Sequence, residues 1–175
     1  MKTACSRLIP CTLFALVLIL GQTGRAAAFG DHEVRVVATA TFTSYSAGDP
    51  GTCNPSTYSP NAGDPACVAF LGELYDVTGD ITGNSVLELS FTGFANGSSV
   101  FSDYQTWNGT LSGHGSGSFI VHEQGFGQPD GSYTSRLSVV DGTGSGGFAG
   151  VTGFGISQGN LSGGVNTLQL KFPEH

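Results

Sequence analysis

Apolar and polar residues alternate at every second position in several short runs of this chain, and glycine-rich turns separate the runs. The clearest run spans residues 33–45, where Val34, Val36 and Ala38 begin an apolar face and threonines occupy much of the other. Successive side chains of a β-strand point to opposite faces, so this period predicts a strand with one buried face. After residue 28 no sustained helical period appears. The chain is therefore expected to be almost entirely β.

Further runs with strand character cover residues 69–78, 85–92, 100–111, 116–124, 133–140, 148–156 and 167–172. Asn96-Gly97 and Asp141-Gly142 lie between runs and indicate hairpins, because these residue types tolerate the positive φ of tight turns. Asn108-Gly109 lies inside a run and predicts a β-bulge. About eight short antiparallel strands favour a single closed up-and-down barrel, which leaves no exposed sheet edge. A two-sheet β-sandwich is the alternative.

The chain is apolar enough to form one folded domain despite its glycine content. Twenty-eight glycines and 11% charged residues would suit a disordered chain, but apolar residues make up 39% and include twelve phenylalanines. Such a composition supplies a core for one domain, which we place at residues 29–175.

The first 28 residues have the pattern of a secretory signal peptide. Lys2 and Arg7 precede an apolar run at residues 11–20, which is too short to span a bilayer as a helix. Three alanines at 26–28 supply the small residues that signal peptidase needs, so cleavage is expected after Ala28. The protein is therefore predicted to be secreted or periplasmic, and an uncleaved anchor is the alternative.

Loss of this segment makes the domain strongly acidic. Three of the six cationic residues lie within it, so only Arg35, Arg136 and Lys171 remain to balance thirteen acidic residues. A domain with so few cations cannot neutralise phosphates. We expect no nucleic-acid partner and no stable membrane anchor after cleavage, and we attribute most of the acidity to solubility.

Two cysteines remain after residue 28, Cys53 and Cys67, and they bracket a loop rich in proline and glycine. In an oxidising compartment this arrangement predicts a disulfide, which would stabilise the fold by roughly 3 kcal/mol in the chain-entropy model. The loop, about residues 46–66, has no strand pattern. A loop of this length in a compact domain is usually functional or an insertion.

No metal or cofactor is expected. The tetrapeptide Ala-Gly-Asp-Pro occurs twice, and its Asp49 and Asp64 would suit calcium, but Asp-Pro pairs are ordinary turn formers. A two-cysteine metal site lacks further ligands, because the histidines show no ligand spacing to the cysteines; they are His32, His114, His122 and His175. The glycine-rich segment 142–147 lacks the helix that a nucleotide-binding motif requires, so it is predicted to be a tight turn between strands.

Strand parity indicates which polar residues face the barrel interior. If Phe101 points inward, Asp103, Gln105 and Trp107 share its face. By the same reasoning, Glu123 points inward if Phe119 does, and Glu73 and Tyr75 point inward if Leu71 does. Glu88 has the opposite parity on its strand and faces solvent. These seven residues are the candidate cavity lining: Asp103, Gln105, Trp107, Phe119, Glu123, Glu73 and Tyr75.

An acid in an apolar interior has its charged form disfavoured, which can suit it to general acid or base chemistry. The alternative is that these polar groups sit at the mouths of the barrel, hydrated or hydrogen-bonded to turn amides. No catalytic residue is assigned.

Two glycine-rich stretches resemble a known family. WNGTLSGHGSGSFIVH at 107–122 and DGTGSGGFAGVTG at 141–153 are similar to a bacterial domain family of unknown function that is grouped with the allene oxide cyclase-like barrels. Dirigent proteins share a similar segment and an eight-stranded barrel. The likeness covers roughly residues 72–172 and departs in the cysteine loop.

The resemblance implies a small barrel whose interior, in characterised relatives, binds an apolar or phenolic molecule and guides a cyclisation or coupling. The catalytic glutamate and asparagines of the plant cyclases match no positions here, so their activity is not carried over. Three hypotheses stay open: a carrier for a small apolar or phenolic ligand, a cofactor-free isomerase or cyclase, and a structural or surface-interaction barrel packed solid with side chains.

Overall fold

The computed structural model describes residues 32–48 and 65–174, which form nine β-strands and no helix. The strands are β1 (His32–Ala47), β2 (Pro65–Gly79), β3 (Ile81–Phe94), β4 (Ser99–Leu111), β5 (Gly115–Gly127), β6 (Ser132–Val139), β7 (Ser145–Gly146), β8 (Thr152–Asn160) and β9 (Gly163–Phe172). Within these ranges no helix long and apolar enough to cross a membrane occurs. The predicted signal peptide and cleavage site lie outside the described residues.

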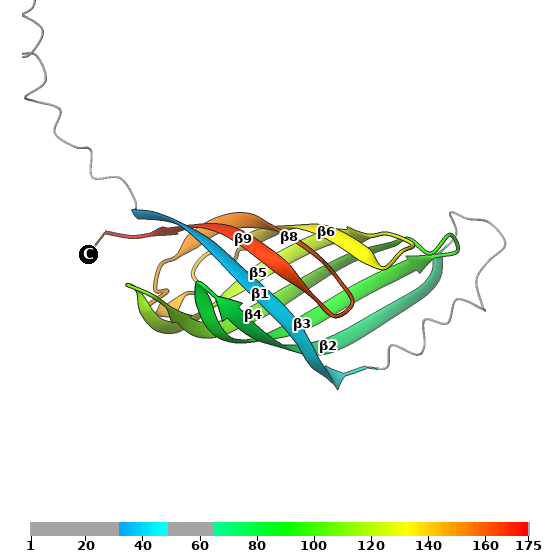
Figure 1. Ribbon diagram of the computed structural model, residues 1–175, viewed down its shortest axis with the longest axis horizontal. Helices are drawn as coiled ribbons and strands as arrows, with labels where there is room; N and C mark the ends of the chain where they lie inside the picture. The colour runs from blue at the N-terminus through cyan, green and yellow to red at the C-terminus, as the bar shows by residue number, and fades with distance from the viewer. Residues whose placement is uncertain (1–31, 49–64, 175) are drawn as a thin grey trace, which may run out of the picture. The chain divides into compact units, whose positions relative to one another are not determined.

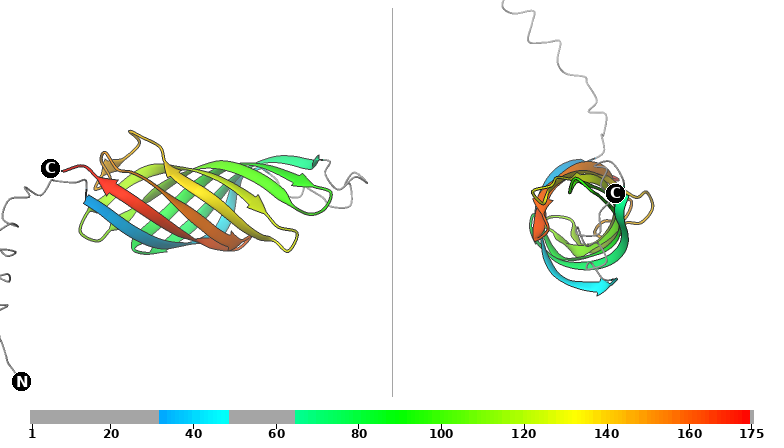
Figure 2. Two further views of the ribbon diagram at one scale, coloured as in Figure 1. Left: turned by 90° about the horizontal axis from the view of Figure 1, so that it is seen from above. Right: turned by 90° about the vertical axis from the view of Figure 1, so that its right-hand side faces the viewer.

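Eight of these strands close into an antiparallel barrel. The order around the sheet is β4-β3-β2-β1-β9-β8-β6-β5, and β5 pairs back onto β4. The end-on view in Figure 2 shows the ring that results. All pairings are antiparallel, and the short β7 pairs only with β5. The prediction of a single eight-stranded barrel is confirmed, and the sandwich alternative is wrong.

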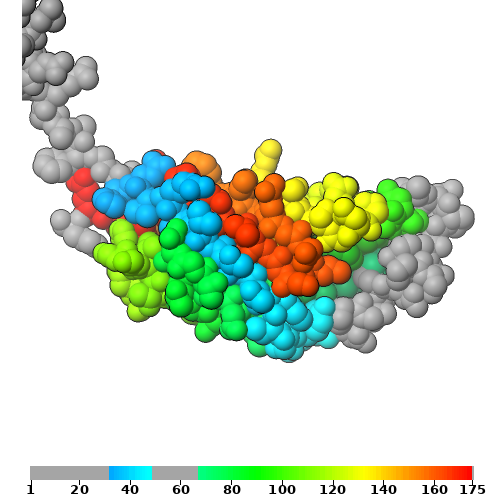
Figure 3. All heavy atoms as spheres, in the orientation of Figure 1, coloured from blue at the N-terminus to red at the C-terminus, as the bar shows by residue number. Residues whose placement is uncertain are grey.

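The barrel has two unlike ends. The β3–β4, β5–β6 and β8–β9 turns lie at one end, which we call the open end (Figure 1). The β2–β3 and β4–β5 turns lie at the other, which we call the closed end, together with the connection from β6 to β8. On the face drawn in Figure 3, side chains of β1, β8 and β9 form a continuous outer wall.

The closed half of the barrel is filled by an apolar core. Trp107 and Phe119 are almost fully buried there, and their rings lie 5.8 Å apart between centroids. Aliphatic side chains from β1, β2, β5, β6 and β9 fill the rest of this half: Val36, Ala38, Val77, Val121, Leu137, Val139, Leu168 and Leu170. Ile81 and Leu111 complete it near the turns.

The β6–β8 connection supplies a plug for the closed end, which corrects two predictions. The expected strand at 148–156 begins only at Thr152, because Phe148 belongs to a turn in which its N–H donates to the Ser145 carbonyl. Phe148 is fully buried and packs on Phe119 and Phe172, with ring centroids 4.8 and 6.2 Å away. Its apolar character thus reflects insertion into the barrel rather than strand alternation.

Segment 142–147 is likewise not a simple tight turn. It contains β7, which pairs with Gly117 and Ser118 of β5. A Cβ on Gly117 would lie 1.9 Å from the Ser145 carbonyl oxygen, so glycine is required for this close pairing. The Asp141-Gly142 turn has the expected positive φ of 77° at Gly142, but it leads into this excursion instead of directly into the next barrel strand.

The other two turn predictions had different outcomes. Asn96-Gly97 forms the β3–β4 turn with a φ of 83° at Gly97, which confirms the hairpin. The bulge predicted at Asn108-Gly109 is wrong, because β4 stays in register there with both neighbouring strands. Gly109 stands opposite Gly83 in the neighbouring strand. A Cβ added at Gly83 would lie 2.0 Å from the Asn108 carbonyl oxygen, so these glycines allow the two backbones to approach closely.

Candidate functional site: an interior cavity at the open end

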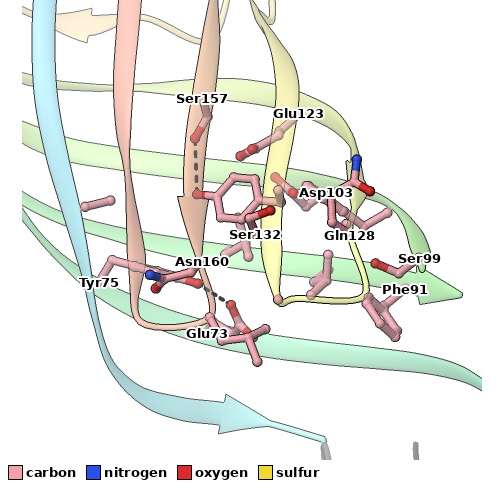
Figure 4. Close-up of a pocket in the computed structure, with 18 of the residues that line it drawn as sticks. Glu73, Tyr75, Phe91, Ser99, Asp103, Glu123, Gln128, Ser132, Ser157 and Asn160 are labelled. Carbon is pink, nitrogen blue, oxygen red and sulfur yellow. Dashed lines mark hydrogen bonds between the residues drawn. The ribbon is translucent and has the colours of Figure 1, made fainter. Parts of the chain in front are cut away.

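The open half of the barrel contains a cavity of about 330 Å³. Its apolar wall includes Ala40, Leu87, Leu89, Phe91 and Phe101, contributed by β1, β3 and β4. Its polar lining comes from six strands: Glu73, Tyr75, Asp103, Gln105, Glu123, Tyr133, Ser157 and Asn166. Figure 4 shows several of these side chains converging on one space, with Ser99, Gln128 and Asn160 nearer the rim.

Two acids face each other across neighbouring strands inside this cavity. Asp103 of β4 and Glu123 of β5 are direct partners in the antiparallel register, and they are only 2% and 6% exposed. Like charges directly opposite each other on one face of a sheet are destabilising. A third acid, Glu73 of β2, lines the same cavity and is 8% exposed.

The three carboxyl groups differ in their hydrogen bonds. Glu73 accepts a hydrogen bond of 2.5 Å from the Tyr75 hydroxyl, and Glu123 accepts one from the Ser135 hydroxyl. The Oδ1 atom of Asp103 is buried and has no hydrogen-bond partner among the described residues. A buried acceptor left without a partner costs roughly 1–3 kcal/mol. Within the described residues, the hydrogen bonds to Glu73 and Glu123 therefore come from side-chain hydroxyl groups inside the barrel.

Burial raises the pKa of all three acids, because it disfavours their charged forms. Burial, with smaller contributions from the charges of Glu123 and Glu73, raises the pKa of Asp103 to about 9. Burial also raises the pKa of Glu123 to about 7, although the hydrogen bond from Ser135 opposes this. The pKa of Glu73 is raised by burial as well, against the hydrogen bond from Tyr75.

Two tyrosines place neutral hydroxyl groups beside the acids. Burial raises the pKa of Tyr133 to about 12, and its hydroxyl lies 3.2 Å from the Ser157 Oγ. The Tyr133 ring packs edge-on against Phe101, with centroids 5.7 Å apart. Burial and the hydrogen bond to Glu73 raise the pKa of Tyr75 above its usual range. Both phenols therefore stay protonated; the Tyr75 O–H is already donated to Glu73, and the Tyr133 hydroxyl pairs with Ser157.

Gln105 forms the boundary between the cavity and the packed core. Its Nε2 donates to the Ser85 Oγ at 3.0 Å, and its Oε1 accepts from the Trp107 Nε1 at 2.6 Å. These bonds hold the amide in one orientation beneath the acids.

The structure gathers five of the seven candidate residues at the cavity: Glu73, Tyr75, Asp103, Gln105 and Glu123. Trp107 and Phe119 point inward from the same strands but belong to the closed-end core and do not line it. Lining residues that sequence reasoning missed include Tyr133, Ser157 and Asn166. Tyr133 has the same parity on β6 as the apolar residues Leu137 and Val139, so its inward direction could have been predicted. In β8, glycines occupy the positions that share parity with Ser157, so no apolar side chain marks its inward face.

Other predicted features lie elsewhere. Cys53, Asp49 and Asp64 are outside the described residues, so the disulfide with Cys67 stays a prediction. His122 stacks on Tyr104, which is 54% exposed, and lies 3.0 Å from the Ser102 Oγ, away from the cavity. In residues 32–48 and 65–174, no group of three histidine, cysteine or acidic side chains is placed to hold a metal ion.

Fold and site together define a small antiparallel β-barrel with one half packed and an acidic cavity in the other. Residues 53–172 match the DUF3224 family, described as proteins of unknown function, and the chain belongs to this family. It is similar to the crystal structure of a DUF3224 protein of unknown function from Shewanella oneidensis MR-1, with 19% identity and a TM-score of 0.54. The match covers 83% of this chain and all of that one, and it shows a shared fold. No curated protein matches the chain.

Proposed function

We propose that the barrel binds a small molecule with an apolar or phenolic body in its interior cavity. The observation that carries this proposal is that the eight-stranded barrel is not filled: about 330 Å³ stays open between apolar walls and a few convergent polar groups. Eight strands enclose just enough space for side chains or for one small ligand. A largely apolar pocket with few polar groups is the usual form of a small-molecule site.

A substitution that fills the cavity tests this proposal. Leu89 lines the cavity from β3, so Leu89→Trp should occupy the space a ligand needs and reduce the affinity for 1-naphthol, a small phenolic probe, by about tenfold or more. Fluorescence titration of the purified protein measures the change. Val86→Trp is the matched control, because Val86 lies on the same strand and faces outward. Equal affinity in the two variants, or no saturable binding to the unmodified protein, would contradict interior binding.

We also propose that the protein acts outside the cytoplasm. The pattern of residues 1–28 supports a cleaved signal peptide, and a domain with three cations and thirteen acids suits a soluble role. Material collected outside the cytoplasm is expected to begin at or next to Phe29. N-terminal sequencing that returned Met1 would refute the cleavage.

A cofactor-free isomerase or cyclase in the allene oxide cyclase-like group is the second candidate. The observation in its favour is a pair of facing acids with unequal raised pKa values, about 7 at Glu123 and about 9 at Asp103. Such a pair can divide the roles of general base and general acid at neutral pH. The third hypothesis, a structural barrel packed solid with side chains, is less well supported, because only the closed half of the barrel is filled by side chains.

A further inference from the structure

We propose that the polar group of the cavity's ligand is a cation: a protonated primary or secondary amine attached to a small aromatic or aliphatic body. This inference rests on the proposed interior binding and names the class of ligand. It is carried by the unpartnered oxygen of Asp103, by the balance of charged side chains around the cavity and by its aromatic wall.

The Asp103 side chain presents a buried oxygen that no donor in residues 32–48 and 65–174 satisfies. It is 98% buried, lines the cavity, and its Oδ1 has no hydrogen-bond partner in the described part of the chain (Figure 4). The neighbouring acids Glu123 and Glu73 accept hydrogen bonds from Ser135 and Tyr75, so among the described buried side chains the unsatisfied acceptor is Asp103 Oδ1. An ammonium group carries three N–H donors and no acceptor, which matches an environment rich in carboxyl oxygens.

Among the described residues, the ionisable side chains that line the cavity are acids and tyrosines. The titratable groups that line the cavity with Asp103 are Glu73 and Tyr75 from β2, Tyr45 from β1, Glu123 from β5 and Tyr133 from β6. Each of these groups is neutral when protonated and negative when ionised, so none of them can carry a positive charge. The cations of the described strands, Arg35, Arg136 and Lys171, have exposed side chains and do not line the cavity.

Buried carboxylates normally require a paired cation. An organic cation from solution would supply it and would also offset the repulsion between Asp103 and Glu123, which face each other across β4 and β5. An anionic ligand would add to that repulsion. A neutral acceptor such as a ketone would engage one protonated acid and leave the pair uncompensated.

The wall of the cavity suits the body of such an amine. Phe91, Phe101 and Tyr133 line it, and aromatic faces attract ammonium groups as well as apolar rings. Leu87 and Leu89 add aliphatic surface on β3. The site therefore combines one charged end with an apolar enclosure.

Three ligands that differ only in their polar group test the inference. Isothermal titration of the purified protein at pH 7.5 would compare 2-phenylethylamine, 2-phenylethanol and phenylacetate. We expect the amine to bind at least about tenfold more tightly than the alcohol, and phenylacetate to bind most weakly, because charged hydrogen bonds are the stronger ones. Asp103→Asn should reduce amine affinity by about tenfold while changing alcohol affinity little. Asp76→Asn, an exposed position on β2, is the matched control and should change neither.

The pH dependence gives a second, independent readout. An ammonium ion favours the ionised carboxyl groups, so binding should release protons, and amine affinity should rise from pH 5.5 to pH 8 as Glu123, with its pKa of about 7, ionises. Alcohol affinity should not rise over this range. Circular dichroism checks that each variant is folded.

Equal binding of amine and alcohol would overturn the cation assignment while leaving interior binding intact. No binding by any of the three would also overturn it, and the 1-naphthol titration with Leu89→Trp would then decide the proposed function separately. Tighter binding of phenylacetate would reverse the sign of charge inferred here.

Discussion

Replacing Phe148 with alanine is expected to lower the free energy of unfolding by about 3–5 kcal/mol. Phe148 is fully buried and lies between Phe119 and Phe172, so truncation leaves a cavity at the closed end that its neighbours cannot readily fill. The connection that carries it contains close glycine contacts; a Cβ on Gly144 would lie 1.9 Å from the Phe148 carbonyl oxygen. Urea denaturation followed by circular dichroism measures the change.

Phe154→Ala is the matched control for this prediction. Phe154 follows shortly after the plug on β8, but it is 61% exposed, so its truncation should cost much less. A Phe148→Ala midpoint no lower than that of Phe154→Ala would contradict the role of Phe148 as the plug. It would also weaken the division of the barrel into a packed half and an open half.

Replacing Asp103 with asparagine is expected to stabilise the empty protein at pH 8 and to have little effect at pH 4. Asp103 titrates near its ordinary value of 3.8 when unfolded and near 9 when folded, so between these values the unfolded state binds fewer protons. The contribution of Asp103 to the free energy of unfolding is therefore largest below about pH 4, and it falls as pH rises toward 9. Asparagine removes this loss, which should raise the free energy of unfolding at pH 8 by on the order of 3 kcal/mol.

Urea denaturation at a series of pH values from 4 to 9 measures this effect. The unmodified protein should lose stability across the range, and Asp103→Asn should show a shallower slope. Asp76→Asn should keep the original slope, because its side chain is exposed and lies outside the cavity. Parallel slopes for the unmodified protein and Asp103→Asn would show that Asp103 is not a buried acid with a raised pKa.

A gain in stability on removal of Asp103 has a functional meaning. Facing acids inside a barrel cost folding free energy, and residues kept at such a cost are characteristic of binding and catalytic sites. The same substitution is expected to weaken amine binding. Stability and affinity should therefore change in opposite directions at this one position.

The barrel was predictable because its strands alternate cleanly. In β1, Val36, Ala38 and Ala40 are buried and Arg35, Thr39 and Thr41 are exposed, as the two-residue period requires. The plug was not predictable, because Phe148 precedes a strand and reads as its first residue. Only tertiary packing on Phe119 and Phe172 distinguishes an inserted turn from the start of a strand.

Parity in the sequence also indicated the acids of the cavity but not the boundary of the cavity. Asp103, Gln105 and Trp107 share a face of β4, yet Asp103 lines open space and Trp107 lies in a packed core. Which positions stay open depends on side-chain volumes summed over eight strands, with Phe148 added at one end only. A single strand's pattern does not contain that information.

Backbone amide NMR of the protein titrated with 2-phenylethylamine tests whether a ligand binds inside the open half of the barrel. We expect saturable shifts concentrated at cavity positions such as Asp103, Glu123 and Tyr133, with little change at Val139 and Leu170 in the closed-end core. The shifts should be absent in Leu89→Trp. Shifts confined to outward-facing positions such as Tyr104 and Phe154, or persistence of the cavity shifts in Leu89→Trp, would contradict interior binding.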